Sequence, residues 1–338
     1  MRPTLSDVAR LASVSVATAS RALSNPDLVA DGTRRAVREA ANSCGYKINL
    51  VARSLRIQRT DTLLVLAPEI DNGFYPALLH GIEDAALDLG YTVLVGFTAK
   101  SEKHRQSYAD LLSNGRVDGM LVMDGGSGVN RFTGPRPDLP TVQVLDRIYA
   151  PPVPVVRVDD GEVADLAVRH LSSLGHHRIA HIAGSAAAPH ALERRNGFVA
   201  AMGRAGLPVE EHLMVSGDGG WEGGLQAMRQ LLSLPQRPTA VFCADDALAC
   251  AAMNVCREQG LRVPEDISLI GANDTQDGQR AYPPLTTVHV PRTDIGATAA
   301  NLLIGLIRGQ PGAESDTVLP VELRERATCA PLRAAVAA

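Results

Sequence analysis

The first residues of the chain carry a helical apolar pattern that ends at a short polar break. Apolar side chains recur three and four residues apart, which predicts one face of a helix, at Leu5, Val8, Ala9 and Ala12. Thr4 is placed to cap this helix, with Asp7 three residues later as its reciprocal partner. The segment Ser13-Val14-Ser15 interrupts the pattern, so we expect a three-residue turn before the next helix.

A second helix is predicted from Ser15, whose hydroxyl is placed to cap it. Its apolar face is expected to comprise Val16, Ala19 and Leu23. Its other side carries Ala17, Thr18 and Arg21. Two short helices joined by such a turn have the spacing of a DNA-binding helix-turn-helix, in which the second helix meets base edges. Val16 and Ala17 would then touch thymine methyl groups, and Arg21 would donate to a guanine or a phosphate. The same spacing also fits an ordinary helical hairpin.

Asp31 is placed to cap a third helix, which is expected to run from about Thr33 to Ser43 and to end at Gly45. The residues that would pack it on the first two helices are Val37, Ala40 and Ala41. The residues expected to point outward are Arg34, Arg35 and Arg38, which suits either phosphate contacts or a solvated charged face. The amphipathic segment 49–57 follows, and is either a linker or a helix too short to be stable alone.

From Thr62 onward, short apolar runs alternate with helical segments. Runs of strand length in the first set are "TLLVLA", "TVLVG", "GMLVM" and "PTVQVLD". After "PVVRVDD" a second set includes "RIAHIAG", "TAVFCA", "SLIGAN" and "TTVHVP". Helices are expected between the later runs, at 161–174, 191–205, 222–232, 246–259 and 292–308. Continuous apolar strands separated by helices indicate parallel sheets covered on both faces, so the sequence predicts two similar α/β lobes.

Length, composition and cysteine content narrow the class of protein. A chain of 338 residues with 45% hydrophobic residues suits two or three compact units. No apolar run reaches the roughly 18 residues of a membrane helix, and "MRPTLSDVARL" lacks the apolar stretch of a secretory signal. The five cysteines are odd in number and form no CxxC pair. A reduced protein of the cytoplasm, with no membrane partner, is therefore expected.

Charge is distributed unevenly along the chain. Residues 1–60 contain ten Lys/Arg and four Asp/Glu, a net charge of +6, whereas the whole chain carries −4. The remaining residues must therefore carry −10. A basic first module on an acidic body suits phosphate contact by that module alone.

A family resemblance adds to these observations. The stretch "TLSDVARLASVSVATASRALSNPDLVADGTRRAVREAANSCGYKINLVARSLR" resembles the headpiece of the lac repressor (LacI/GalR) family, and the likeness continues to "PPLTTVHVPRTDIG". At "LPQRPTAVFCADD" and "GLRVPEDISLIG" the chain is similar to the branch that contains the cytidine and purine repressors. The resemblance implies an N-terminal all-α helix-turn-helix headpiece followed by a two-lobed α/β core of the periplasmic-binding-protein type.

The resemblance also implies domain limits and partners. Residues 1–48 would form the DNA-binding domain, 49–60 a hinge helix or linker, and 61–330 an effector-binding and dimerisation core. Within the core, lobe 1 would span about 61–159 and 291–319, and lobe 2 about 160–290 and 320–330. The implied partners are double-stranded operator DNA, a small-molecule effector and a second copy of the chain, with a tetramer as a further option.

The implied DNA contacts match the family's positions in the headpiece and hinge. They are Thr4, Ser15, Val16, Ala17, Thr18, Ser20, Arg21, Asn25, Arg34, Arg53, Ser54 and Leu55. Leu55 would insert between base pairs in the minor groove, as an apolar wedge on a short arginine-flanked helix.

Seven residues match positions that contact the effector in the family. They are Phe74, Tyr75, Asp146, Arg194, Trp221, Asp245 and Asn273. Ligands of open α/β sheets bind at the carboxyl ends of strands, and the cleft between two lobes is the expected pocket. Read singly, Asp245 and the adjacent Asp246 are also plausible helix caps, Phe74 a core residue and Arg194 a surface charge.

Two positions depart from the family's pattern. Asn273 stands where members that bind neutral sugars or nucleosides commonly carry aspartate, and Gly219 stands at the aromatic lid position, two residues before Trp221. Asparagine removes a negative charge and adds hydrogen-bond donors. An anionic effector paired by Arg194 and Arg195 is one interpretation, and a nucleoside or neutral sugar is the other.

Other chemistries have weaker support. A metal site at His176, His177 and His181 is not expected, because His177 and His181 are four residues apart across a predicted strand. The glycine-rich "GDGGWEGG" lacks the lysine of a phosphate loop, and no Ser/His/Asp or Cys/His motif appears. We therefore predict a DNA-binding repressor controlled by a sugar, sugar acid or nucleoside, neither an enzyme nor dependent on a cofactor. The alternatives are a solute-binding protein, which would need a signal peptide, and an α/β enzyme, which would need a catalytic motif.

Overall fold

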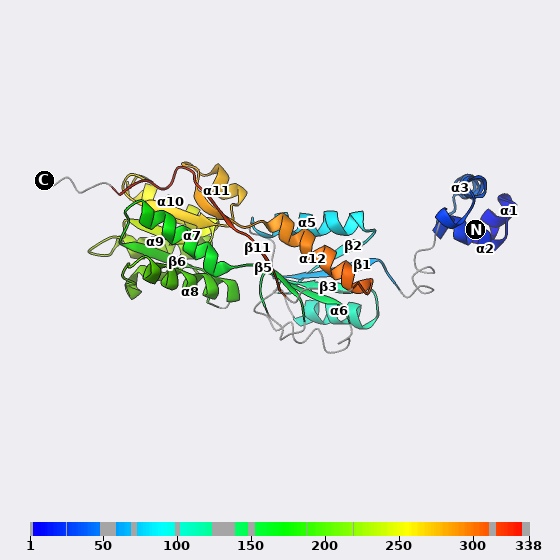
Figure 1. Ribbon diagram of the computed structural model, residues 1–338, viewed down its shortest axis with the longest axis horizontal. Helices are drawn as coiled ribbons and strands as arrows, with labels where there is room; N and C mark the ends of the chain where they lie inside the picture. The colour runs from blue at the N-terminus through cyan, green and yellow to red at the C-terminus, as the bar shows by residue number, and fades with distance from the viewer. Residues whose placement is uncertain are drawn as a thin grey trace. The chain divides into compact units, whose positions relative to one another are not determined.

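The computed structural model describes most of the 338 residues, in two compact units (Figure 1). The described ranges are 3–24, 26–47, 59–68, 73–98, 102–123, 139–147, 153–186, 188–218, 220–310 and 316–332. The units are Met1–Thr60, which we call the headpiece, and Asp61–Ala338, which we call the body. The predicted hinge segment 49–57 lies outside the described residues.

The described part of the headpiece consists of short helices around a small apolar core. They are α1 (Leu5–Leu11), α2 (Val16–Ser24), the 3-10 turn η1 (Pro26–Leu28) and α3 (Asp31–Cys44). The buried core residues are Val8, Ala9, Ala19, Ala22, Val37, Ala40 and Ala41. These small side chains let three short helices pack closely. The predicted helix-turn-helix, with a third helix packed on it, is confirmed.

Side-chain caps determine where α1 and α2 begin. Thr4 Oγ1 accepts from the backbone N–H of Asp7 at 3.3 Å, and the Asp7 carboxylate accepts from the backbone N–H of Thr4 at 3.0 Å. Ser15 Oγ accepts from the backbone N–H of Thr18 at 3.1 Å. The expected start of α3 is wrong, because this helix already begins at Asp31 and no side chain caps it. Asp31 instead lies in the first turn, where its charge favours the helix dipole.

The buried face of α2 also differs from the prediction. Val16 is 46% exposed, whereas Ala19 and Ala22 are buried. The apolar stripe therefore continues through Ala22 and not through Val16. A helix of nine residues offers few positions to distinguish the two stripes by spacing, and packing against both α1 and α3 buries one of them.

Lobe 1 of the body, as far as it is described, is a parallel sheet with the strand order β11-β5-β4-β3-β1-β2. Its strands are β1 (Thr62–Ala67), β2 (Thr92–Phe97), β3 (Gly119–Val122), β4 (Thr141–Val144), β5 (Val155–Val158) and β11 (Asp316–Leu319). Its helices are α5 (Tyr75–Asp88), α6 (Glu102–Ser113) and α12 (Arg292–Ile307). Alternate residues of β1 face opposite sides. Leu63 and Val65 join the core under α5 and α12, and Leu64 and Leu66 join the core under α6.

Lobe 2 repeats this arrangement, with the strand order β12-β10-β9-β8-β6-β7 over its described residues. Its strands are β6 (Ile179–Ala183), β7 (Met214–Ser216), β8 (Ala240–Cys243), β9 (Ser268–Ala272), β10 (Thr286–His289) and the antiparallel β12 (Glu322–Arg324). Its helices are α7 (Asp160–Ser173), α8 (Pro189–Arg204), η3 (Glu211–Leu213), α9 (Trp221–Leu232), α10 (Asp246–Glu258) and α11 (Gln276–Arg280). Helices α7 and α8 cover one face of the sheet, and α9 and α10 cover the other.

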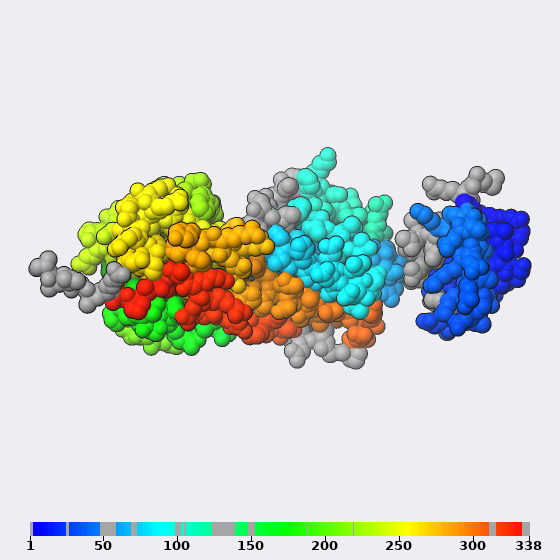
Figure 2. Space-filling view, turned by 90° about the horizontal axis from the view of Figure 1, so that it is seen from above, coloured from blue at the N-terminus to red at the C-terminus, as the bar shows by residue number. Residues whose placement is uncertain are grey.

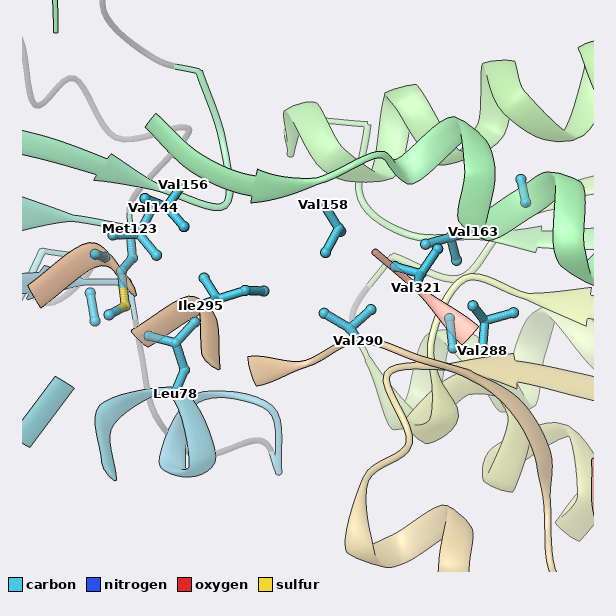
Figure 3. Close-up of a cluster of buried hydrophobic side chains, with 14 of the residues drawn as sticks. Leu78, Met123, Val144, Val156, Val158, Val163, Val288, Val290, Ile295 and Val321 are labelled. Carbon is cyan, nitrogen blue, oxygen red and sulfur yellow. The ribbon is translucent and has the colours of Figure 1, made fainter. Parts of the chain in front are cut away.

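Crossing segments join the two lobes after β5, after β10 and after β11. Val158, Val290 and Val321 lie at these crossings and belong to one buried cluster that reaches into both lobes (Figure 3). In the space-filling view, the red C-terminal segment with β11 and β12 runs over both lobes beside the orange α12 (Figure 2). The late segments thus complete lobe 1, as the resemblance implied, and the predicted two-lobed α/β fold is confirmed.

Two of the three histidines considered as metal ligands, His176 and His181, have structural contacts. His176 is buried, with Nδ1 3.0 Å from the Thr239 hydroxyl and Nε2 3.0 Å from the Ser268 hydroxyl. His181 on β6 is fully buried, and its Nδ1 is 3.0 Å from the Phe242 carbonyl that it can donate to. Among the described residues its Nε2 has no hydrogen-bond partner. Burial lowers the pKa of His181 to about 4, so this ring is neutral in the folded chain at neutral pH.

We expect His181 to make the folded chain less stable as the pH falls below 6.5. Between its ordinary pKa of 6.5 and the folded value of about 4, the unfolded state binds a proton that the folded state does not. The loss should reach about 2 kcal/mol at pH 5. Urea unfolding at pH 7.5 and pH 5.0 measures it, with His181→Phe as the non-titrating reference. Equal pH dependence in the two proteins would contradict this role of His181.

Candidate functional site

The exposed side of α2 carries residues expected to meet DNA bases. Val16, Ala17 and Arg21 are exposed there. Thr18 is half-buried, and its hydroxyl lies 2.8 Å from Ser15 Oγ, so these two hydroxyls are tied together at the start of the helix. Short side chains at this end allow a close approach to a groove, and the Arg21 guanidinium projects from the last turn. This surface fits the base-reading helix of the motif.

Arg34 differs from its neighbours Arg35 and Arg38, which are exposed on α3. The Arg34 guanidinium lies 2.5 Å from the carboxylate of Asp31 and 3.7 Å from that of Asp27. Its charge is therefore partly compensated within the headpiece. Exposed pairs of this kind contribute only about 0–1 kcal/mol, so a phosphate can displace these partners.

The other predicted DNA contacts divide into two groups. Thr4 serves as the cap of α1, and the Ser20 carbonyl accepts from the Ser24 hydroxyl at 2.7 Å. Four of the predicted DNA contacts lie outside the described part of the chain: Asn25, Arg53, Ser54 and Leu55.

A pocket of about 760 Å³ in the body is lined by residues of both lobes. It brings together six of the seven predicted effector residues: Phe74, Tyr75, Arg194, Trp221, Asp245 and Asn273. Most of them follow the carboxyl end of a parallel strand or start the next helix, which is where ligands of such sheets bind. The seventh residue, Asp146, is not among the lining residues. It contacts His190, and His190 lines the pocket.

Arg194 on α8 is buried and held by protein groups. Its Nε donates to Asp160 Oδ1 at 2.9 Å, and its Nη2 donates to the same oxygen. Its Nη1 donates to the Ala244 carbonyl and, at 3.5 Å, to Asn273 Oδ1. The side chains of Arg194 and Asp160 are only 6% and 4% exposed. The reading of Arg194 as a surface charge is therefore wrong, and Asp160 compensates the charge that it brings to the pocket.

The adjacent carboxylates of Asp245 and Asp246 have different surroundings. Asp245 caps α10, because its Oδ1 accepts from the backbone N–H of Leu248 at 2.8 Å. Burial raises the pKa of Asp245, and the group lines the pocket without an ion pair among the described residues. Asp246 instead accepts from the Thr287 hydroxyl at 2.6 Å and from the Thr275 hydroxyl at 3.0 Å. Burial raises the pKa of Asp246 to about 6. Asp245 is thus the carboxylate with capacity left for a ligand.

A contact between the lobes involves His190, which lines the pocket. Helix α8 begins at Pro189 without a side-chain cap from its own N-terminal residue, Ala188. Asp146, which follows β4 in lobe 1, accepts from the backbone N–H of His190 at 3.0 Å and lies 3.1 Å from His190 Nδ1. Burial lowers the pKa of His190, but the hydrogen bond and charge of Asp146 outweigh this and raise it. Asp146 therefore caps a helix of the other lobe.

Sequence reasoning missed His190. The signal available for it was the absence of Ser, Thr, Asp or Asn at the start of α8, where the chain reads Ala188-Pro189. A helix that lacks its own cap and begins beside a cleft needs a partner from elsewhere.

The aromatic residues of the pocket lie on both lobes. Phe74 and Tyr75 meet edge to face, with ring centroids 5.4 Å apart, and both also pack against the main core. The two interpretations of Phe74, as pocket residue and as core residue, therefore both hold. Trp221, at the start of α9, lines the pocket from lobe 2 and is 46% exposed. Gly219, at the family's lid position, lies outside the described residues.

Two protein-family models match the chain. Residues 4–49 match the lacI family of bacterial regulatory proteins, and residues 168–329 match a periplasmic binding protein-like domain. Among curated proteins, the HTH-type transcriptional repressor CytR of Escherichia coli K12 is 38% identical over 322 residues, which are 95% of this chain and 94% of CytR. The HTH-type transcriptional regulator DegA of Bacillus subtilis is 34% identical over 98% of this chain and 99% of DegA.

Solved structures resemble the chain over almost its whole length. The structure of the lac repressor dimer bound to operator and the anti-inducer ONPF matches 98% of this chain and 100% of the repressor chain, with a TM-score of 0.85 and 28% identity. The complex of the transcriptional regulator CelR with cellobiose matches 97% of this chain and 100% of CelR, with a TM-score of 0.75 and 31% identity.

Proposed function

The chain belongs to the lacI family of bacterial regulatory proteins, and from this premise we propose that it represses transcription under the control of a small molecule. The headpiece holds the operator and the body holds the effector. The observation that carries the proposal is the combination, in one chain, of a helix-turn-helix with an exposed α2 and a pocket of about 760 Å³ lined by two lobes. The similarity to CytR over 95% of the chain supports it.

We assign residues 1–48 to DNA binding, 49–60 to a hinge helix or linker, and 61–330 to effector binding and dimerisation. The similarity to a lac repressor that is a dimer on operator DNA supports a dimer of this chain on a pseudo-palindromic site. The proposed base contacts come from the exposed side of α2. The proposed minor-groove wedge is Leu55.

Salt dependence tests the placement of the DNA site. The net charge of +6 on residues 1–60 should release counterions from DNA, so the logarithm of the binding constant should fall linearly with the logarithm of salt concentration. The measurement is fluorescence anisotropy with duplexes selected from a random library. Binding that persists in a variant lacking residues 1–60 would place the DNA site elsewhere.

Arg21→Ala should weaken binding to the selected duplex by about 1–3 kcal/mol and relax its sequence preference, because a donor to base edges is removed. Arg10→Ala is the matched control. It removes the same charge from α1, where Arg10 pairs with Asp7 and lies outside the base-reading helix. Competition with mutated duplexes separates the loss of affinity from the loss of sequence preference. Equal losses on specific and random duplexes for Arg21→Ala would exclude base reading by this residue.

We propose that the effector is an uncharged sugar or nucleoside in preference to a sugar acid or sugar phosphate. Arg194 is compensated by Asp160, and Asp245 lines the pocket without an ion pair among the described residues. An anion held about 4 Å from a carboxylate meets a repulsion of about 1–4 kcal/mol, depending on how much water remains. Hydroxyl groups can instead donate to Asp245 while rings pack on Phe74 and Trp221.

Titration calorimetry with matched uncharged and anionic probes tests this class. Cytidine and cytidine 5′-monophosphate form one pair, and glucose and gluconate form another. The uncharged member of a pair should bind at least tenfold more tightly if it binds at all. Tighter binding of either anion would reject the uncharged class.

We infer that the chain is not an enzyme and acts in the cytoplasm, where operator DNA lies. The relatives reported above are named as transcriptional regulators, not as enzymes. The helices that the structure describes include none with the length and hydrophobicity to cross a membrane. A solute-binding protein of the same core fold is disfavoured by the lacI-family match at residues 4–49.

A further inference from the structure

We propose that Arg292 is a positioning residue for effector binding, whose guanidinium clips the pocket wall of lobe 1 to that of lobe 2. The inference rests on the proposed effector function of the pocket. Arg292 is not one of the lining residues. It is the first residue of α12, just after the chain crosses from β10 in lobe 2 to lobe 1.

The hydrogen bonds of Arg292 reach both walls. Its Nη1 donates to the Gly73 carbonyl at 2.8 Å and to the Phe74 carbonyl at 3.5 Å, both in lobe 1. Its Nη2 donates to the Asp274 carbonyl at 2.9 Å, in lobe 2. Gly73 and Phe74 line the pocket, and so does Asn273, next to Asp274. A planar guanidinium presents its donors in a fixed fork, so these contacts set the separation of the two walls.

The turn that Arg292 holds in lobe 2 is strained. Asn273 and Asp274 follow β9 with φ values of 100° and 53°, in the left-handed region that few residues other than glycine adopt. Such a turn persists only where its surroundings hold it. His289 Nδ1 lies 3.1 Å from the Asp274 carboxylate, and Gln279 Nε2 donates to the Asp274 carbonyl at 3.2 Å. Arg292 adds a hydrogen bond to this turn from lobe 1, and so orients Asn273 toward the pocket.

On the lobe 1 side, Arg292 also fixes the aromatic wall. Its Cζ lies 5.8 Å from the centroid of the Phe74 ring, within the range of a cation–π contact. The guanidinium thus contacts backbone carbonyls and one aromatic ring. Opening the lobes separates the Asp274 carbonyl from Nη2 while the contacts within lobe 1 remain. The clip therefore favours the arrangement in which both walls can contact one ligand.

The same helix offers a matched control. Arg308 follows the last turn of α12, and its Nη2 donates to the Leu89 carbonyl at 3.0 Å. Its Cζ lies 5.9 Å from the centroid of the Tyr91 ring. Arg308 thus combines a carbonyl and an aromatic ring as Arg292 does, but all its partners here belong to lobe 1. Arg292→Met and Arg308→Met each remove a guanidinium that contacts backbone carbonyl oxygen and an aromatic ring. Only Arg292→Met also removes a link between the lobes.

Hydrogen–deuterium exchange of the full chain tests the clip without any ligand. Arg292→Met should accelerate amide exchange about tenfold in both walls, at 73–80 and at 273–280, because a charge-assisted bond to each is lost. Arg308→Met should leave 273–280 unchanged. Arg292→Lys should behave like Arg292→Met, since an ammonium group lacks the fork that spans two lobes. Acceleration confined to 73–80, or equal acceleration in Arg308→Met, would overturn the proposal.

Ligand and operator titrations separate positioning from a structural role. Trp221 is the chain's one tryptophan and lines the pocket, so its fluorescence reports binding. Cytidine and glucose serve as probes. For a probe that binds the wild type, Arg292→Met should lower the affinity about tenfold. Operator affinity in the absence of probe should stay within about twofold of the wild-type value. Unchanged probe affinity would overturn the positioning role. If neither probe binds the wild type, the exchange result alone decides the clip.

Discussion

Replacing Arg194 with methionine should lower the free energy of unfolding by about 3–5 kcal/mol, because the substitution leaves the Asp160 carboxylate buried without its partner. Asp160 is 4% exposed, and both Nε and Nη2 of Arg194 donate to it. Urea unfolding measures the loss, and Arg195→Met on the same helix is the control. A variant as stable as the control would show that the pair is not needed for folding.

A double variant separates stability from effector binding. Replacing both members of a buried ion pair with apolar residues is often neutral, because no uncompensated charge remains. Arg194→Met with Asp160→Leu should therefore regain most of the lost stability. We expect effector response to stay lost in the double variant while operator binding survives, since the proposed pocket contact is gone. A double variant that responds like the wild type would remove Arg194 from the effector site.

The elements that the sequence predicted correctly have local causes. Thr4 and Asp7 are three residues apart, so their reciprocal cap depends on one turn of helix alone. The residues of β1 after Thr62 are all apolar because both faces of the strand are covered, and this pattern needs no knowledge of distant partners. The prediction that Val16 lies on the buried face of α2 is wrong, because that face is set by packing against α1 and α3, which is not a local property.

The polar contacts of the pocket lie beyond such local reasoning. Asp160 and Arg194 are 34 residues apart, and Asp146 and His190 are 44 residues apart and come from different lobes. In the sequence, Asp159 and Asp160 stand only at the expected limit between lobe 1 and lobe 2. In the structure, Asp159 caps α7 through the backbone N–H groups of Gly161 and Glu162, whereas Asp160 turns inward to Arg194. Strand ends located the pocket residues, but only the packed lobes decide which charges are paired.

Gly81→Ala and Gly296→Ala should each destabilise the chain by about 3 kcal/mol, at the upper end of the usual cost of overpacking. These glycines lie where α5 and α12 cross. A Cβ atom on Gly81 would lie 2.0 Å from the Thr293 carbonyl oxygen, and one on Gly296 would lie 2.1 Å from the Leu78 carbonyl oxygen. Both obstacles are backbone atoms, so relief requires the helices to separate. Thermal or urea unfolding measures the loss.

Gly305→Ala in the same helix is the matched control. A Cβ atom there would first meet the end of the Gln310 side chain, at 3.2 Å, which can move aside. Alanine also favours a helix over glycine by about 1 kcal/mol, so this variant should be as stable as the wild type or slightly more stable. Because α5 starts after Phe74 and α12 starts at Arg292, separating the helices should also disturb the lobe 1 wall of the pocket. Gly296→Ala should therefore weaken effector response as well as stability, and stability equal to that of Gly305→Ala would show that the crossing tolerates a methyl group.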